Sequence, residues 1–251
     1  LMSINVHTTT TEEEKIMQLH VREVARILDV SEKTIYRWIK QGAIPAYRVQ
    51  DQYRVHRAEL LEWVTKRKMK VSEEIFQEPE ADGEQPGLAS ALEAGGIFYR
   101  VEGRDRDTVL REVVDAMRLP DGVDRGFLYQ VILAREKMCS TAVGDGIAIP
   151  HPRSPLVLHV ARPSITLSFL EYPVEFGAID NQPVRALFTL VSPTVRGHLV
   201  LLSRLSFAIH DPQFKQVILS PGTREEILRE ARRLDEILDN KAPNGEKRNA
   251  V

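Results

Sequence analysis

The spacing of apolar residues predicts two short helices near the start of the chain, over residues 21–28 and 32–40. The side chains expected to face inward from these helices are Val21, Val24, Ala25, Leu28, Ile35, Trp38 and Ile39. Residues 29–30 form a tight turn, Ser31 is a good N-cap for the second helix, and Gly42 ends it. Two short helices joined by a tight turn are typical of a helix-turn-helix unit.

The pattern after the second helix changes to that of a small hairpin, over residues 44–56, and a closing helix, over 57–63. The recognisable motifs are the Val30-Ser31 turn, Thr34-Ile-Tyr-Arg-Trp38, Gly42-Ala-Ile-Pro-Ala-Tyr-Arg48 and Tyr53-Arg-Val-His-Arg57. With these motifs, the segment 18–70 resembles the excisionase-like, MerR-type winged helix-turn-helix family. The resemblance implies a small DNA-binding domain.

The expected second helix and hairpin carry side chains suited to DNA contact. Lys33, Thr34 and Arg37 lie on the outward face of a helix whose first turns would enter a major groove. The arginines around the hairpin, where a wing could meet phosphates, are Arg48, Arg54 and Arg57. The alternative is a basic face that binds only protein. Because so small a module makes few base contacts, we expect a homodimer or a helper protein.

The longer second part of the chain alternates between helical and strand patterns. The expected helices cover 89–95, 106–119, 126–138, 197–209 and 223–239, the last opened by a Thr223–Glu226 capping box. The expected strands cover 97–101, 164–169, 174–176 and 184–191. Interleaved helices and strands predict the α/β class, with a mixed sheet flanked by helices, preceded by the winged helix-turn-helix domain.

Charge and composition divide the chain into its expected parts. Residues 19–70 carry twelve Lys/Arg and six Asp/Glu, whereas 71–88 carry six acids and no base. We therefore expect an acidic linker over 71–87, between the helix-turn-helix domain and an α/β domain over 88–239. The polar ends, 1–17 and 240–251, are expected to be disordered. One cysteine, no membrane-spanning run and no signal-peptide core predict a cytoplasmic protein without membrane insertion.

The candidate chemistry centres on Gly144-Asp-Gly-Ile-Ala-Ile-Pro-His151. Pro150 fixes its own φ and biases Ile149 towards an extended conformation. His151 is therefore expected just past a strand, where the backbone leaves the sheet and can present one reactive side chain.

The motifs around this histidine resemble one family over about 150 residues. They are Ala134-Arg-Glu136, Ser140-Thr141, Gly144 to His151, Ala178-Ile-Asp-Asn-Gln-Pro-Val184 and Gly197-His-Leu199. The segment is similar to the fructose/mannitol-type (type-2) enzyme IIA domain of the bacterial phosphotransferase system, nearest to its nitrogen-regulatory branch. Two residues depart from the family pattern: Pro152 replaces the usual glycine, and Asp145 stands where asparagine is common.

The resemblance implies a phosphoryl-transfer site. His151 would accept a phosphoryl group from phospho-HPr or its nitrogen-branch counterpart, which makes the domain, if active, a phosphotransferase. His198 would hydrogen-bond to the phosphoryl oxygens, and Arg135 would offset their charge. No cofactor is implied. The two histidines could also bind zinc, but no third ligand has the spacing of a metal site.

Together, the two resemblances predict a regulatory phosphocarrier in which the phosphorylation state of His151 tunes DNA binding. Other regulated partners, such as a sensor kinase or a transporter, fit the same resemblance. Three alternatives remain: an enzyme IIA that feeds a separate sugar permease, a DNA-binding regulator whose IIA fold is only a sensor, and an excisionase-like recombination factor.

Overall fold

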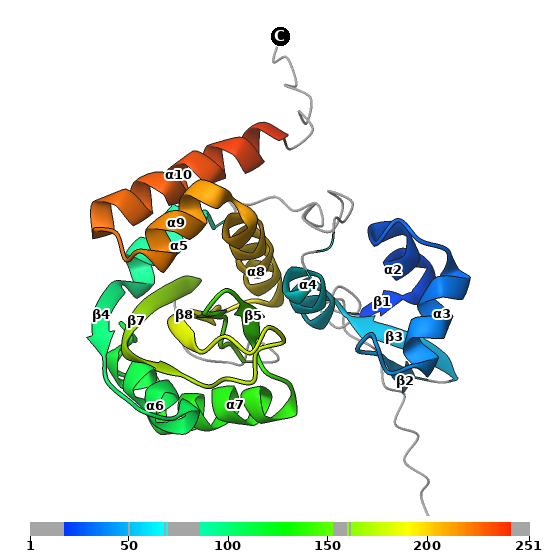
Figure 1. Cartoon of the computed structure of the whole chain (residues 1–251), viewed down its shortest axis with the longest axis horizontal. Coiled ribbons are helices and arrows are strands. Elements are labelled where there is room, and N and C mark those ends of the chain that lie inside the picture. Colours follow the sequence, from blue (N-terminus) through cyan, green and yellow to red (C-terminus); the bar gives the residue numbers. More distant parts are fainter. Residues whose placement is uncertain are drawn as a thin grey trace, which may run out of the picture.

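The computed structural model describes residues 18–49, 51–67, 69, 86–152, 160 and 162–241. The expected N-terminal tail, residues 71–85 of the expected linker, and residues 242–251 of the expected C-terminal tail lie outside the described residues. The described residues form two units: a helix-turn-helix unit (residues 18–67) and an α/β unit (residues 86–241), as Figure 1 shows.

The helix-turn-helix unit contains the predicted pair of helices, hairpin and closing helix. Its elements are β1 (Gln18–His20), α2 (Val21–Ile27), α3 (Glu32–Lys40), β2 (Tyr47–Val49), β3 (Gln52–His56) and α4 (Arg57–Lys66). The strands form an antiparallel sheet in the order β1-β3-β2. Strand β1 was not predicted, because three residues are too few for a recognisable alternation and gain strand geometry only by pairing with β3.

Local chemistry sets the boundaries of α3. The Ser31 hydroxyl accepts a hydrogen bond from the Thr34 backbone N–H at 3.2 Å, which confirms the predicted N-cap. Asp29 has φ 52° in the turn before it, and Gly42 has φ 63° just past its end. The predicted inward face is also confirmed: Ile35 is buried, and Trp38 and Ile39 pack against the core.

The α/β unit is a five-stranded mixed sheet with helices on both faces, as predicted. Its helices are α5 (Leu88–Gly95), α6 (Arg106–Ala116), α7 (Arg125–Met138), α8 (Val195–His210), α9 (Pro212–Leu219) and α10 (Arg224–Lys241). Its strands are β4 (Ile97–Val101), β5 (Ala142–Gly144), β6 (Ile147–Ala148), β7 (Ser164–Val174) and β8 (Val184–Val191). The sheet order is β4-β7-β8-β6-β5, with parallel pairs β4/β7 and β6/β8 and antiparallel pairs β7/β8 and β5/β6.

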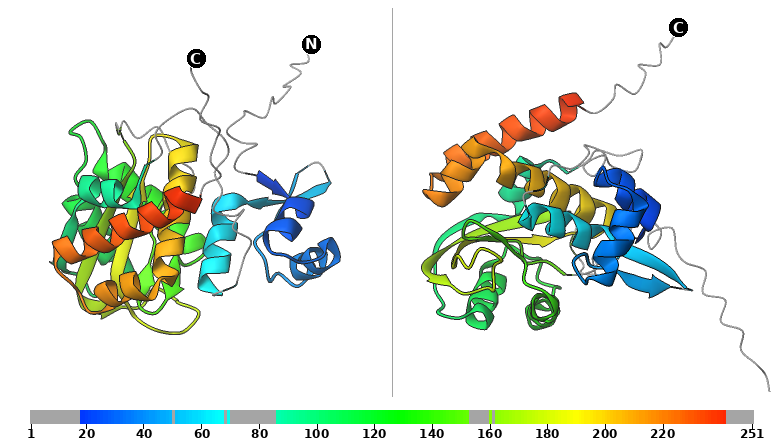
Figure 2. Two further views of the ribbon diagram at one scale, coloured as in Figure 1. Left: turned by 90° about the horizontal axis from the view of Figure 1, so that it is seen from above. Right: turned by 45° about the vertical axis from the view of Figure 1, so that its right-hand side comes forward.

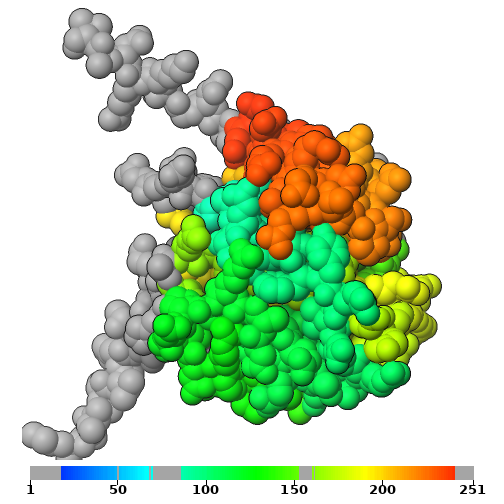
Figure 3. Space-filling view, turned by 90° about the vertical axis from the view of Figure 1, so that its left-hand side faces the viewer, coloured from blue at the N-terminus to red at the C-terminus, as the bar shows by residue number. Residues whose placement is uncertain are grey.

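The sheet separates two groups of buried apolar side chains. Ala186, Phe188 and Leu190 of β8 face the group that includes α5, α8, α9 and α10. Leu187 and Val191 face the other group, with α6 and α7. The period-two alternation of β8 therefore assigns one helical layer to each face (Figure 1). The surface formed by the β4–α6 region and α10 lies on the opposite side of the molecule from the helix-turn-helix unit (Figure 3).

Three element predictions in the α/β unit were wrong in detail. Residues 164–169 and 174–176 were expected as separate strands, but β7 runs through to Val174 with a register irregularity between Phe169 and Val174. The helix expected over 106–119 ends at Ala116, because Met117 adopts an extended conformation (φ −58°, ψ 143°). Helix α9 was missed, although Asp211 caps it and Pro212 occupies its first turn.

Helix α4 joins the two units. It packs against α8 and β5 of the α/β unit as well as β3 of its own unit (Figure 2). None of its ten residues is exposed. The apolar core of the helix-turn-helix unit is continuous through this contact with the core on the α8 side of the sheet. The sequence did not predict this junction, because it pointed to a solvated linker between independent domains.

Candidate functional site

His151 follows the short β5–β6 hairpin, at the point where the chain leaves the sheet. The hairpin turn is Gly144-Asp-Gly146, and all three residues have positive φ, at 95°, 54° and 75°. Asp145 also pairs with Lys215 across 2.9 Å, which accounts for a carboxylate at this position. After β6, the Pro150 carbonyl accepts a hydrogen bond from the Leu190 N–H at 3.1 Å, so the backbone before His151 is fixed on the sheet.

The His151 ring has one nitrogen committed to the backbone. Its Nδ1 lies 2.7 Å from the carbonyl oxygen of Ile149. A carbonyl oxygen only accepts hydrogen bonds, so Nδ1 carries the proton. When the ring is neutral, its lone pair is therefore on Nε2, which is the nitrogen suited to nucleophilic attack.

His198 lies beside this ring in the first turn of α8. Thr194 caps that helix by accepting a hydrogen bond from the Gly197 N–H. The two histidine ring centroids are 5.2 Å apart, and His198 is fully buried. Among the described residues, neither of its ring nitrogens has a hydrogen-bond partner. Burial, followed by the charge of His151, holds the pKa of His198 well below its usual value. A neutral imidazole here has an N–H available for an additional acceptor.

Arg135 reaches the site from the last turn of α7. Its Nη1 donates to the Cys139 carbonyl oxygen at 2.7 Å, which fixes the guanidinium at the helix end. The side chain is buried. Burial alone would lower its pKa, but the charge of Glu62 and the hydrogen bond to it raise the pKa further. The guanidinium, His151 and His198 come together from α7, the segment after β6 and α8.

Glu62 of α4 is the residue in contact with this site that the sequence did not predict. Nη2 of Arg135 donates to both of its carboxylate oxygens, with Oε2 at 2.5 Å. Oε1 lies 3.2 Å from His151 Nε2. Burial would raise the pKa of Glu62, but the hydrogen bond from His151 and the charges of His151, Arg135 and Lys66 lower it to about 2. The carboxylate is therefore ionised and fills the space in front of the predicted nucleophile.

A signal for Glu62 exists in the sequence. It stands in Leu60-Leu61-Glu62-Trp63-Val64, with bulky apolar residues on both sides. A lone acid within such a run is expected to be buried, and a buried carboxylate needs a cation or hydrogen-bond donors. The pattern does not identify the partner, because Arg135 and His151 are 73 and 89 residues further along the chain.

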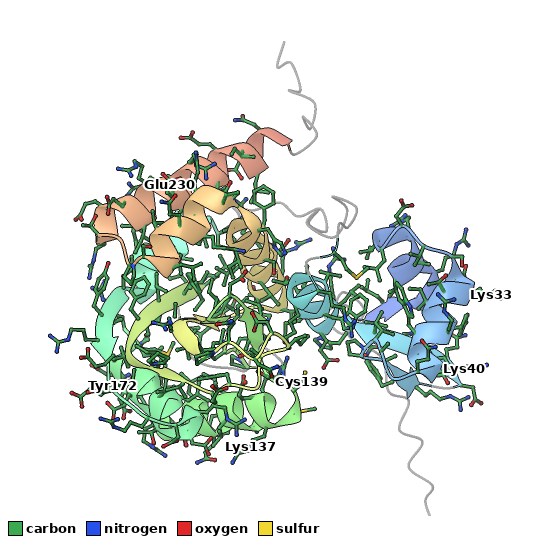
Figure 4. The ribbon with its side chains drawn as sticks, viewed as in Figure 1. Lys33, Lys40, Lys137, Cys139, Tyr172 and Glu230 are labelled. Carbon is green, nitrogen blue, oxygen red and sulfur yellow. The ribbon has the colours of Figure 1, made fainter. Side chains whose placement is uncertain are left out.

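The predicted DNA-binding residues lie on α3, on the β2–β3 hairpin and at the start of α4. Helix α3 lies away from the α/β unit, and Figure 4 shows Lys33 on its outward side. Lys33 and Arg37 are exposed, whereas Thr34 is half-buried and its hydroxyl contacts that of Ser31 at 3.0 Å.

The three predicted wing arginines differ in environment. Arg48 is exposed and pairs with Asp51 at 3.0 Å in the hairpin turn. Arg54 is half-buried and donates to the Tyr53 carbonyl and to Gln52. Arg57 starts α4 and is half-buried, and its burial lowers its pKa in spite of the nearby Glu23. Lys33, Arg37 and Arg48 are therefore the most accessible of the six predicted DNA-binding side chains.

In the part of the chain that the structure describes, no group of three or more His, Cys, Asp or Glu side chains is arranged to hold a metal ion. No helix in the same residues is both long and apolar enough to cross a membrane.

Comparison with known proteins gives matches to both units. Residues 90–232 match the family described as phosphoenolpyruvate-dependent sugar phosphotransferase system, EIIA 2, and residues 19–68 match a helix-turn-helix domain family. A nitrogen regulatory protein of Escherichia coli is 38% identical over 142 residues, covering 56% of this chain and 86% of that protein. One of Pseudomonas aeruginosa is 32% identical over 142 residues, covering 55% and 90%. The crystal structure of nitrogen regulatory protein IIA-Ntr from Neisseria meningitidis is 25% identical, with a TM-score of 0.48, and covers 54% and 92%.

Proposed function

Because this chain belongs to the type-2 enzyme IIA family of the phosphoenolpyruvate-dependent sugar phosphotransferase system and also carries a helix-turn-helix domain, we propose that it is a phosphorylation-controlled DNA-binding regulator. In this proposal His151 accepts a phosphoryl group from the phosphohistidine of HPr or of its nitrogen-branch counterpart. The state of His151 then controls how the helix-turn-helix unit binds DNA.

The convergence of Arg135, His151 and His198 in one buried site carries the proposal. In the transfer step, the lone pair of His151 Nε2 attacks phosphorus while the P–N bond of the donor breaks. The electron pair of that bond returns to the donor imidazole, so no net proton is gained or lost. Nδ1 stays protonated throughout, because it donates to the Ile149 carbonyl.

The neighbours of His151 suit the phosphorylated product. The Arg135 guanidinium offers a planar pair of donors and a positive charge to phosphoryl oxygens. A neutral His198 ring can donate an N–H to a further phosphoryl oxygen, and its ring nitrogens have no other hydrogen-bond partner among the described residues. This site supports a phosphoryl-accepting domain over one that serves only as a folded sensor.

The position of α4 separates this proposal from a sugar-transport relay. A relay must receive a phosphoryl group from one protein and pass it to another, so Nε2 has to be accessible in each turnover. Here His151 is only 1% exposed, and Glu62 of the helix-turn-helix unit covers it. A covered site fits a switch that changes state on phosphorylation better than a relay in constant use.

Incubation of the full chain with phosphoenolpyruvate, enzyme I and HPr, or the nitrogen-branch counterparts of the last two, tests the phosphoryl-transfer step. We expect acid-labile phosphate on the wild type and none on His151→Ala. Arg135→Lys, which loses the planar pair of donors, and His198→Leu, which loses the ring N–H, are expected to slow the transfer. Absence of label with both carriers, on the wild type and also on Glu62→Ala, which lacks the covering carboxylate, would contradict the proposal. DNA binding by the two forms then tests the regulatory step.

A further inference from the structure

The carboxylate of Glu62 stands where an incoming phosphoryl group would have to go. We propose that Glu62 is an internal stand-in for the phosphoryl group, so that docking of α4 on the α/β unit and phosphorylation of His151 exclude each other. This inference rests on the proposed role of His151. It assigns to α4 a regulatory function in addition to its structural role in the helix-turn-helix unit.

The contacts of Glu62 are those suited to a phosphoryl group on Nε2. Arg135 Nη2 donates to both carboxylate oxygens, and His151 Nε2 is 3.2 Å from Oε1. The planar guanidinium recognises carboxylates and phosphoryl groups with the same donors. A P–N bond is much shorter than 3.2 Å, so phosphorus and its three oxygens would take up the volume that the carboxylate now fills. The two groups compete for one position.

Electrostatic repulsion between the phosphoryl group and the Glu62 carboxylate adds to their steric overlap. Phosphorylation brings a charge of roughly −1.5 to −2 next to the ionised Glu62. Glu62, Arg135 and His151 are all at least 95% buried, so solvent screens their charges little. Besides His151, the side chains of Arg135 and of Lys66, which lies 3.7 Å from Glu62, contact this carboxylate among the described residues. Because the phosphoryl group is bonded to His151, the carboxylate on its separate helix is the group that must leave.

Conversely, the contact with Glu62 prevents phosphorylation, because it fixes the protonation of the His151 ring. Nδ1 of His151 already carries a proton, because it faces a carbonyl oxygen. A hydrogen bond from Nε2 to the Glu62 carboxylate requires a second proton, on Nε2. An imidazole protonated on both nitrogens has no lone pair for attack on phosphorus. While the contact persists, His151 is neither accessible nor nucleophilic, so the carrier acts on the undocked form.

Helix α4 also contacts α3 from its other side. Trp63, the residue after Glu62, donates from Nε1 to the Ala43 carbonyl at 2.5 Å. Its ring centroid lies 5.6 Å from that of Trp38 in α3. Lys66 adds a hydrogen bond to the Ser140 carbonyl, which ties the end of α4 to the segment before β5. If Glu62 leaves the site, the neighbouring Trp63 moves with it, and the contact between Trp63 and Trp38 of α3 changes.

Hydrogen exchange of the α4 amides, measured with the extent of phosphorylation on the same full-length sample, tests the inference. The wild type is compared before and after treatment with phosphoenolpyruvate, enzyme I and HPr. We expect exchange in α4 to accelerate on phosphorylation by at least about a hundredfold, near the lower end of the factor that corresponds to breaking a buried ion pair. Unphosphorylated Glu62→Ala should show a similar acceleration, and Glu62→Gln a smaller one.

The matched control is Glu112→Gln, which removes the same charge from an exposed position of α6 and should leave α4 exchange unchanged. A fully phosphorylated wild type with unchanged α4 exchange would overturn the inference and leave the proposed phosphoryl transfer intact. Lack of label on both the wild type and Glu62→Ala would instead overturn the proposed transfer, and the inference with it.

Discussion

Helices α3 and α4 belong to the same small unit but use their outer faces in opposite ways. Of the nine residues of α3, only Ile35 is fully buried, and side chains such as Tyr36 are 43% exposed. None of the ten residues of α4 is exposed, and Glu62 and Thr65 are among its buried residues. The unit therefore leaves one helix largely exposed and packs the other against the α/β unit.

The largest expected difference is in the free energy of unfolding, between substitutions in the buried Glu62–Arg135 ion pair and substitutions on the surface of α3. Arg135→Met leaves the Glu62 carboxylate buried without its main cation, so the free energy of unfolding should fall by about 3–5 kcal/mol. Arg37→Met, at an exposed position of α3, should change it by no more than about 0.5 kcal/mol. Urea denaturation of the full chain measures both.

A double substitution sharpens this comparison. Replacement of both charged partners in Glu62→Leu/Arg135→Met leaves no unpaired charge, so it should cost less than Arg135→Met alone. Equal losses for Arg135→Met and Arg37→Met would show that α4 is no more committed to the α/β unit than α3 is.

The second effect is a pH dependence of the free energy of unfolding that comes from Glu62 of α4 and has no counterpart on α3. The pKa of Glu62 falls from its ordinary 4.5 to about 2 in the folded chain. As pH falls below 4.5, the unfolded chain binds the proton first, so this stabilisation is complete above pH 4.5 and is lost between about 4.5 and 2. A shift of this size corresponds to about 3 kcal/mol.

Glu62→Gln should remove that dependence. The measurement is the free energy of unfolding of both proteins from pH 6 to the acid limit of folding. A constant difference between the two proteins throughout this range would contradict an ionised, paired Glu62.

A smaller effect concerns His198. Its pKa lies well below 6.5 in the folded chain, so the unfolded chain binds a proton more readily, and stability falls as pH drops below 6.5. The slope from this one group is at most about 1.4 kcal/mol per pH unit. His198→Gln should flatten the curve between pH 6.5 and 5, as thermal unfolding at several pH values can show. An unchanged slope would mean that the His198 ring binds a proton as readily in the folded chain as in the unfolded chain.

The smallest effect on stability is expected on α3, where binding should change instead. Lys33→Ala and Arg37→Ala should each alter the free energy of unfolding by no more than about 0.5 kcal/mol. If each side chain neutralises one DNA phosphate, the dependence of log binding constant on log salt concentration should fall by about 0.9 per substitution. Fluorescence anisotropy with a duplex measures this slope, and Glu112→Gln serves as the control. An unchanged slope for both would exclude α3 from the DNA contact.

The fold was largely predictable because its signals are local. Ser31, the capping box at Thr223 and the alternation of β8 each define an element from neighbouring residues. The register irregularity in β7 and the strand β1 were missed, since both depend on pairing with distant strands. Local patterns carry no information about such partners.

The candidate site was predictable in part, for a related reason. His151, His198 and Arg135 were identified by their resemblance to a family, and the structure brings them together from separate elements. Glu62 lies outside that family's segment, in the helix-turn-helix unit, so no motif of the α/β unit includes it. Its contacts with Arg135 and His151 form only when the two units pack together, and the sequence motifs of either unit alone do not indicate that packing.

The most direct test is the single-turnover rate of phosphoryl transfer from phosphorylated HPr to the wild type and to Glu62→Ala. If α4 covers His151, only the undocked fraction reacts, and the apparent rate is lowered by that fraction. We predict transfer to Glu62→Ala that is at least about tenfold faster, since removal of the carboxylate raises the undocked fraction. Equal or slower transfer to the variant would contradict the account, because it would mean that Glu62 does not restrict access to His151.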